Sequence, residues 1–249
     1  MPAQTIDEVI AALDAIIAKA IEQRSRLGFF AVLYREVTVQ VKDGIAANRF
    51  EDGARMERLD VLFANRYLAA YENFQNGLPA SMCWETAFRA AASWKPLILQ
   101  QLLLGINAHI NLDLGLAAAH TAPGAALPGL KRDFDEINKI LVSLLNEVQS
   151  KLGKLSPWLR WFDVIGWRID EAAFQFSLKI ARREAWKVAQ RFVTLASSEE
   201  ARATMELDAN VAKLARKILW PGWLLGSVAL WMRVWENSDV RGAISILQK

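Results

Sequence analysis

The stretch that decides the fold reads LLLGINAHINLDLG, residues 102–115. It follows Pro96, which suits the first position of a helix. Four polar residues interrupt its apolar run: Asn107, His109, Asn111 and Asp113. A helix that is apolar almost all round belongs in the interior of a protein. We therefore expect a long, buried helix over about 96–119 at the centre of the fold.

The segments on both sides of this stretch also repeat with helical periodicity. Thr5 and Glu8 form a capping box, so the first helix is expected to begin near Ile6. The β-branched run at 37–41 could alternate as a strand, but no other segment offers it a partner strand, so we expect a helix there as well. Further helices are expected over 54–74, 80–92, 130–152, 157–169, 171–195, 198–219, 223–235 and 239–247.

The spacing of these helices favours one domain. The linkers are short, and no repeat or low-complexity segment divides residues 1–249. Heptads are not sustained along the helices, which argues against a coiled coil. The sequence thus predicts an all-α fold, a single globular bundle of about nine to eleven helices around the buried central one.

Composition excludes several classes of protein. Of the 249 residues, 53% are hydrophobic and 23% are charged, which excludes a disordered chain. The net charge of +3 arises from 30 basic and 27 acidic residues spread along the chain, so no nucleic-acid partner is expected. The single cysteine, Cys83, cannot form an internal disulfide, and from the first residues we expect no secretory signal. We expect a cytoplasmic protein.

The segment 218–247 is apolar and rich in tryptophan. Its uncharged part, Ile218–Met232, is shorter than the ~20 residues of a membrane span and contains Pro221, so no transmembrane helix is expected. Two alternatives remain for the segment: helices packed on the domain as part of its core, or peripheral contact with a membrane surface. The tryptophans concerned are Trp220, Trp223, Trp231 and Trp235.

Ionisable residues occupy positions where these helices should be apolar. His109 and Asp113 are four residues apart and lie about 40° from each other on the helical wheel. Asp60, Asp133 and Asp208 each lie among apolar residues on one face of the helix that contains them. Carboxylates are rarely buried unless they are paired or coordinate another group. The set therefore predicts a polar centre inside the bundle.

Each member of this set also has a structural explanation. Asp133 and Asp208 could stabilise the first turn of their own helices. Asp60 could pair with a buried arginine such as Arg66 or Arg183. The histidine–aspartate pair could be a hydrogen-bonded pair of the core.

The chemistry of such a centre has two versions. In the first, Asp113 orients His109 and raises its basicity for acid/base catalysis without a metal. In the second, His109, Asp113 and Asp60 ligate one divalent metal ion, with His120 as a further candidate. The expected cofactor is accordingly none or one divalent metal ion. The residues predicted to be catalytic are His109, Asp113, Asp60, Asn107 and Asn111.

Three blocks of sequence carry a resemblance to a known family: 55–68, 103–115 and 133–138. They resemble an uncharacterised bacterial family of all-helical domains of unknown function, and NAHINLD at 107–113 is the most specific part. The resemblance implies a single helical domain with a shared site near that block, and no activity. The His-x-x-x-Asp spacing is also similar to one element of zinc-dependent phospholipase C and single-strand nucleases, although this chain lacks that family's many other histidines.

These features lead to a ranked set of functions. We expect an enzyme with an apolar, aromatic-lined cavity, in which His109 and Asp113 carry out cyclase- or isomerase-like acid/base chemistry on a small hydrophobic molecule. One alternative is a mononuclear metal-dependent hydrolase that uses His109, Asp113 and Asp60. The other is a non-catalytic helical module that binds a hydrophobic ligand or a partner.

Overall fold

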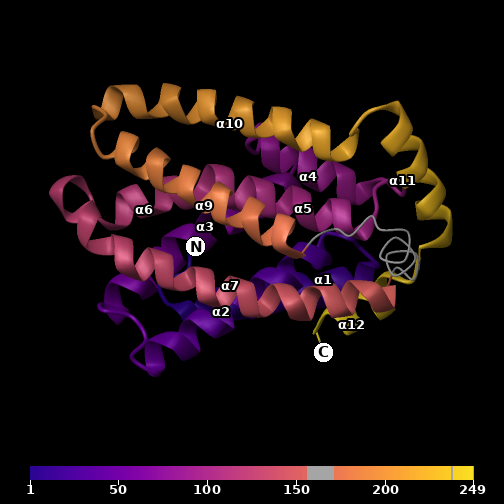
Figure 1. Ribbon diagram of the computed structural model, residues 1–249, viewed down its shortest axis with the longest axis horizontal. Helices are drawn as coiled ribbons and strands as arrows, with labels where there is room; N and C mark the ends of the chain where they lie inside the picture. The colour runs from indigo at the N-terminus through magenta and orange to yellow at the C-terminus, as the bar shows by residue number, and fades with distance from the viewer. Residues whose placement is uncertain (156–170, 237, 249) are drawn as a thin grey trace.

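The computed structural model describes residues 1–155, 171–236 and 238–248, and this part of the chain forms helices with no strand (Figure 1). The predicted all-α bundle is confirmed. Most of its helices run along the long axis of the molecule (Figure 1). The helix expected over 157–169 lies outside the described residues.

The N-terminal part is built from α1 (Ile6–Gln23), α2 (Gly28–Ala46), α3 (Gly53–Gln75) and α4 (Met82–Ala92). α1 begins where the capping box predicts, because Thr5 Oγ1 accepts a hydrogen bond from the Glu8 amide at 3.2 Å. The β-branched run is helical, as expected, and lies within α2. α2 and α3 both pack against the central helix, so both can supply side chains to a site there.

The central helix is continuous from Ile98 to Thr121 and changes its winding on the way. It consists of α5 (Ile98–Ala108), a π-helical segment η1 (His109–Leu114) and α6 (Gly115–Thr121). Its length and composition would suffice to cross a membrane, but 83% of its most apolar window is buried inside the bundle, as in any core helix. The predicted buried central helix is confirmed.

Two glycines of the central helix allow neighbouring helices to approach closely. A Cβ at Gly105 would lie 2.3 Å from the ring of Phe30 in α2. A Cβ at Gly115 would lie 2.7 Å from the Ala185 carbonyl oxygen. Any side chain at these positions would collide with its neighbour, so glycine is required. Gly105 thereby brings Phe30 against the central helix one turn before His109.

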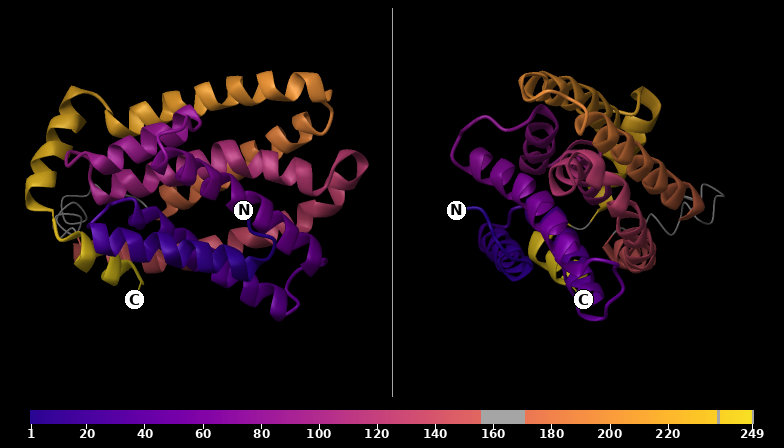
Figure 2. Two further views of the ribbon diagram at one scale, coloured as in Figure 1. Left: turned by 180° about the vertical axis from the view of Figure 1, so that it is seen from behind. Right: turned by 90° about the vertical axis from the view of Figure 1, so that its left-hand side faces the viewer.

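The C-terminal part contains η2 (Gly124–Ala126), α7 (Leu127–Leu155), α9 (Glu171–Phe192), α10 (Ser197–Leu219), α11 (Trp223–Trp235) and α12 (Val240–Gln248). α9 and α10 pack against the central helix, and α12 packs against α2 and α7 with Ala243, Ile244 and Leu247 buried. α11 crosses one end of the bundle between α10 and α12 (Figures 1 and 2). The C-terminal segment thus divides into a core helix, α12, and a helix at the end of the molecule, α11.

Candidate functional site

The candidate site begins at the π-helical turn of the central helix. His109 and Asp113 are 3% and 2% exposed, and His109 Nδ1 lies 3.2 Å from Asp113 Oδ2. The predicted pair therefore forms in the interior. Short π-helical segments within α-helices are frequent at functional sites. The π-helical winding is therefore a second indication, besides burial, that the pair belongs to a functional site.

Asp113 is fixed by donors from two other helices. Arg66 Nε of α3 donates to Asp113 Oδ1 at 3.0 Å, and Trp84 Nε1 of α4 donates to Asp113 Oδ2 at 2.8 Å. A carboxylate paired with a guanidinium only accepts hydrogen bonds, so a neutral His109 carries its hydrogen on Nδ1. The lone pair of His109 is then on Nε2. Asp113 therefore sets both the tautomer and the orientation of the imidazole.

Five aromatic rings surround the imidazole and form an aromatic cage. Their centroids lie between 3.5 and 6.2 Å from that of His109, and they belong to Phe63, Tyr34, Phe30, Trp84 and Tyr67. Phe63 is stacked at 3.5 Å with an interplanar angle of 9°. Burial lowers the pKa of His109, and the hydrogen bond with Asp113 opposes that shift. His109 is accordingly neutral at pH values near 7.

Several polar atoms of this region have no hydrogen-bond partner among the described residues. They are His109 Nε2, Asp60 Oδ2 and the hydroxyl oxygens of Tyr34 and Tyr67. The Thr38 hydroxyl, close to Tyr34, donates to the Tyr34 carbonyl at 3.0 Å. Buried polar groups are normally hydrogen-bonded, so several unpaired ones in one region need an explanation. We call His109, Asp113, Tyr34, Asp60 and Tyr67 the histidine cluster.

Burial shifts the protonation of the other cluster members toward their neutral forms. It raises the pKa of Tyr34 well above its ordinary value, the charges of Asp60 and Asp113 add to that effect, and the nearby Thr38 hydroxyl opposes it. It raises the pKa of Tyr67 as well. Burial, with the nearby charge of Glu57, raises the pKa of Asp60 to about 7. The cluster therefore combines a neutral imidazole acceptor with hydroxyl and carboxyl groups that can donate protons.

Two of the inward carboxylates have a structural role. Asp208 of α10 accepts from the amides of Met82 and Cys83 at 2.6 and 3.0 Å, and so caps the first turn of α4. Asp133 of α7 accepts from the Glu51 and Asp52 amides at 2.7 and 3.2 Å. The sequence suggested that each stabilises its own helix, but Asp208 caps the start of α4, and Asp133 binds the two residues that precede α3. Neither belongs to the histidine cluster.

The remaining predicted site residues lie apart from the aromatic cage. Asn107 Nδ2 donates to the Val211 carbonyl of α10 at 3.2 Å, and Asn107 Oδ1 accepts from Asn111 Nδ2 at 3.0 Å. These two amides therefore connect the central helix to α10. His120 is exposed, with Nε2 2.6 Å from Glu200 Oε1. Among the described residues, no three His, Cys, Asp or Glu side chains form a group that could hold a metal ion.

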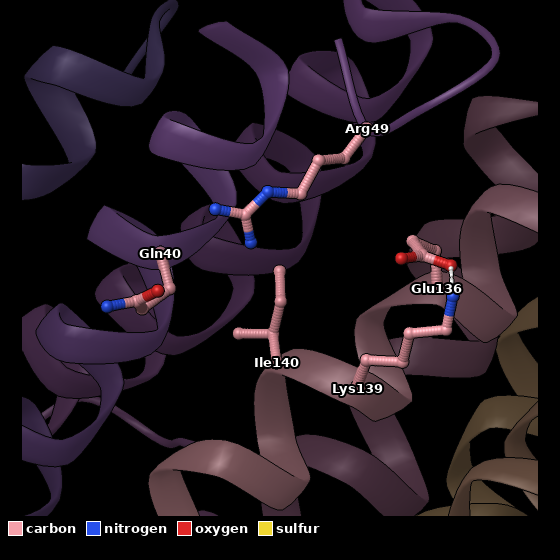
Figure 3. A pocket seen from close by; sticks show the side chains of 5 residues that line it. All are labelled: Gln40, Arg49, Glu136, Lys139 and Ile140. Carbon is pink, nitrogen blue, oxygen red and sulfur yellow. Dashed lines mark ion pairs between the residues drawn. The ribbon is translucent and has the colours of Figure 1, made fainter. Parts of the chain in front are cut away.

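A pocket of about 210 Å³ lies elsewhere, between α2 and α7 (Figure 3). Its lining residues are Gln40, Arg49, Glu136, Lys139 and Ile140. Lys139 is paired with Glu136, with Nζ 2.7 Å from Oε2. None of these residues belongs to the histidine cluster, so this pocket is a separate feature of the surface.

Some residues of the site were not identified from the sequence. Tyr34 was not singled out, and Arg66, which was named with Arg183 as a possible partner of Asp60, binds Asp113 instead. Phe30 and Tyr34 are four residues apart on α2, and Phe63 and Tyr67 are four apart on α3. These two aromatic pairs were a detectable signal. The same spacing is typical of any helix core, so the sequence alone could not assign it to a site.

Comparison with known proteins gives a family and no activity. The model of a family described as "Family of unknown function (DUF5995)" matches residues 6–221. The resemblance of the central block to an uncharacterised domain family is thereby confirmed, and nothing supports the likeness to zinc enzymes. No curated protein and no solved structure matches the chain significantly.

Proposed function

The chain belongs to the family of unknown function DUF5995, and from its own residues we propose that it is an enzyme that transfers protons on a small apolar molecule. The observation that carries the proposal is the state of His109: Nδ1 is held by Asp113, and the buried Nε2 has no partner among the described residues. Leaving a buried polar atom unpaired costs stability. Such a cost is common where a group is reserved for a ligand.

In this proposal His109 is the base. Its neutral imidazole takes a proton from the substrate at Nε2 and becomes an imidazolium. Asp113 stabilises that positive charge and keeps the ring in place, as the carboxylate does in histidine–aspartate pairs of known enzymes. Arg66 and Trp84 act as positioning residues, because their hydrogen bonds fix the Asp113 carboxylate.

The tyrosine hydroxyls are the proposed acids. Their raised pKa values keep Tyr34 and Tyr67 protonated, so each can donate a hydrogen bond to an oxygen atom of the substrate. Negative charge that develops on that oxygen is stabilised most strongly in a dry environment. Asp60, with a pKa of about 7, can exchange protons with this group.

The aromatic cage sets the class of substrate. Its walls are hydrocarbon rings, and its polar atoms are few, which suits an apolar carbon skeleton with one carbonyl or hydroxyl oxygen. Phe63 is partly exposed and lies directly on the imidazole, so its rotation would admit a ligand from the surface. A base and a neutral acid on either side of such a molecule fit an isomerase or a cyclase. No group of described residues favours the metal-dependent hydrolase.

The test is the exchange of carbon-bound hydrogen in simple apolar ketones. Cyclohexanone and acetophenone are incubated with the protein in deuterium oxide, and loss of the hydrogen next to the carbonyl is followed by proton NMR. The wild-type protein should accelerate exchange, and His109→Gln should lower that rate by about 100-fold or more. Tyr34→Phe should lower it by a smaller factor.

His120→Gln is the matched control, because it removes the other histidine of the chain at an exposed position. It should leave the exchange rate unchanged. An exchange rate that survives His109→Gln would contradict the proposal. So would a wild-type protein that accelerates exchange with neither ketone.

A further inference from the structure

α11 is a helix with its polarity reversed. Arg233, its only charged residue, is buried, whereas Trp223, Trp231, Val234 and Trp235 are 63–77% exposed. These four residues follow helical spacing and form one outward stripe. A surface helix normally buries its apolar stripe and exposes its charges. The reversal is therefore a property of this helix and not a scatter of single exposed side chains.

Hydrogen bonds on the inner side fix this orientation. Arg233 Nε donates to the Trp94 carbonyl at 2.6 Å, and Arg233 Nη1 lies 3.5 Å from Glu236 Oε2. Glu236 Oε2 also accepts from the Ile98 amide at 3.0 Å, which caps the start of α5. Rotating α11 to bury its tryptophans would break these buried contacts. These contacts near the start of the central helix thus keep the apolar stripe of α11 exposed to solvent.

Trp220 extends the stripe beyond the helix. It is 55% exposed, and a Cβ at Gly226 would lie 2.7 Å from its ring. Gly226 therefore lets the Trp220 ring lie against α11. We call Trp220, Trp223, Trp231 and Trp235 the tryptophan face. α11 lies at one end of the bundle (Figure 1), and the tryptophans of the face are exposed to solvent, so the face is accessible to a flat surface.

We propose that the tryptophan face binds the surface of an anionic lipid bilayer. Tryptophan is the side chain most typical of the boundary between water and lipid, where its amphipathic ring lies at the level of the headgroups. Lys213, Arg216 and Lys217 are exposed in the last two turns of α10, three to seven residues before Trp220 in the sequence. Basic residues beside an apolar stripe are attracted by anionic headgroups.

The size of the face argues against a second copy of the chain. α11 has 13 residues and is therefore about 20 Å long and about 10 Å wide. The four tryptophans of the face are 55–77% exposed, so at about 150–250 Å² for a whole side chain they offer roughly 400–650 Å² of accessible surface, whereas a stable dimer buries about 800 Å² on each partner. A lipid surface needs no such area, because each tryptophan inserts on its own.

The experiment is cosedimentation of the full chain with vesicles of phosphatidylcholine, with or without phosphatidylserine. The wild-type protein should sediment with the anionic vesicles and much less with phosphatidylcholine alone. Raising the salt to about 1 M should weaken binding, because it screens the basic residues. Trp223→Ser/Trp231→Ser/Trp235→Ser should weaken binding on the order of 100-fold.

Two control variants distinguish binding through the tryptophan face from non-specific binding by other exposed apolar side chains and from loss of the fold. Leu78→Ser/Met82→Ser/Met205→Ser removes three exposed apolar side chains elsewhere and should bind like the wild type. Lys213→Glu/Arg216→Glu/Lys217→Glu keeps every tryptophan and should also weaken binding on the order of 100-fold. Circular dichroism and urea denaturation check the fold of each variant.

Three outcomes would overturn the proposal. The first is a wild-type protein that sediments with neither kind of vesicle. The second is a folded tryptophan variant that binds as the wild type does. The third is a dimer without lipid, seen by light scattering, that the tryptophan variant converts to a monomer, since the face would then join two copies.

Discussion

Asp133 and Asp208 are as deeply buried as Tyr67 and Asp60, but their polar atoms are occupied. Asp208 accepts from two backbone amides, and Asp133 accepts from two amides and from Arg55 Nη2 at 2.8 Å. In the histidine cluster, Asp60 Oδ2 and the Tyr67 hydroxyl lack a partner among the described residues. These two carboxylates stabilise the fold, whereas the cluster is maintained against a cost in stability.

The comparison teaches that burial of a carboxylate does not by itself identify a site. A buried oxygen that receives the amides of a helix start has a structural explanation. Once the buried groups with a structural explanation are set aside, buried polar groups without a hydrogen-bond partner are left. Only these groups indicate a ligand. Within the part of the chain that the structure describes, the histidine cluster supplies four of the six such atoms, and the other two are Arg55 Nε and Gln101 Oε1.

The largest expected effect is on the unpaired side, at Asp60. Its pKa is about 7 in the folded protein against an ordinary 3.8, because burial penalises its charge. The folded state therefore loses stability as the pH rises from about 4 through about 7. This shift corresponds to about 4 kcal/mol. Over that interval the free energy of unfolding of the wild type should fall by about this amount relative to Asp60→Asn, measured by urea denaturation.

Comparing the two proteins at each pH cancels the other titrating groups. Parallel curves for the wild type and Asp60→Asn would show that Asp60 has an ordinary pKa and is hydrated. The comparison between occupied and unoccupied carboxylates would then fail at this residue.

The next largest effect on the free energy of unfolding is expected at Asp208, whose carboxylate oxygens have hydrogen-bond partners. Asp208→Ala leaves the Met82 and Cys83 amides without their acceptor and removes the cap of α4. The free energy of unfolding should fall by about 2–3 kcal/mol. Glu206→Ala, on the exposed side of the same helix, should change it by less than about 0.5 kcal/mol. Equal losses of stability for Asp208→Ala and Glu206→Ala would contradict the capping role of Asp208.

The smallest effect separates two buried hydroxyls that differ in their partners. Thr38→Val removes a hydroxyl that donates to the Tyr34 carbonyl and should cost about 1 kcal/mol. Tyr67→Phe removes a hydroxyl without a partner, and the free energy of unfolding should stay the same or rise by up to about 1 kcal/mol. A clear loss of stability on Tyr67→Phe, measured by thermal denaturation, would show that its hydroxyl is bound within the protein.

The fold followed largely from the sequence because helical periodicity and breakers carry local information. The apolar run at 102–115 predicted the buried central helix, and Thr5 with Glu8 predicted the start of α1. The π-helical turn at His109–Leu114 was not predicted, because the residues in it suit an ordinary α-helix equally well. This turn packs against α3, α9 and α10, which are distant from it in sequence.

The site was predictable only in part. His109 and Asp113 share one face of one helix, so their contact followed from spacing alone. The donors to Asp113 and the acceptor role of Asp208 join residues 47, 29 and 126 positions apart. No local pattern encodes such pairings. The sequence left open whether the tryptophans of α11 are core or exposed for the same reason, since contacts of Arg233 and Glu236 with Trp94 and Ile98 hold the helix in place.

The central claim is that His109 is a neutral base with a free Nε2, held by Asp113. Nitrogen-15 NMR of protein labelled at histidine tests it most directly, with His120→Gln to assign the two imidazoles. The account predicts the tautomer with hydrogen on Nδ1 at neutral pH, and a pKa below the ordinary 6.5 because burial disfavours the charge. A His109 that carries its hydrogen on Nε2, or that is already protonated at neutral pH, would contradict it.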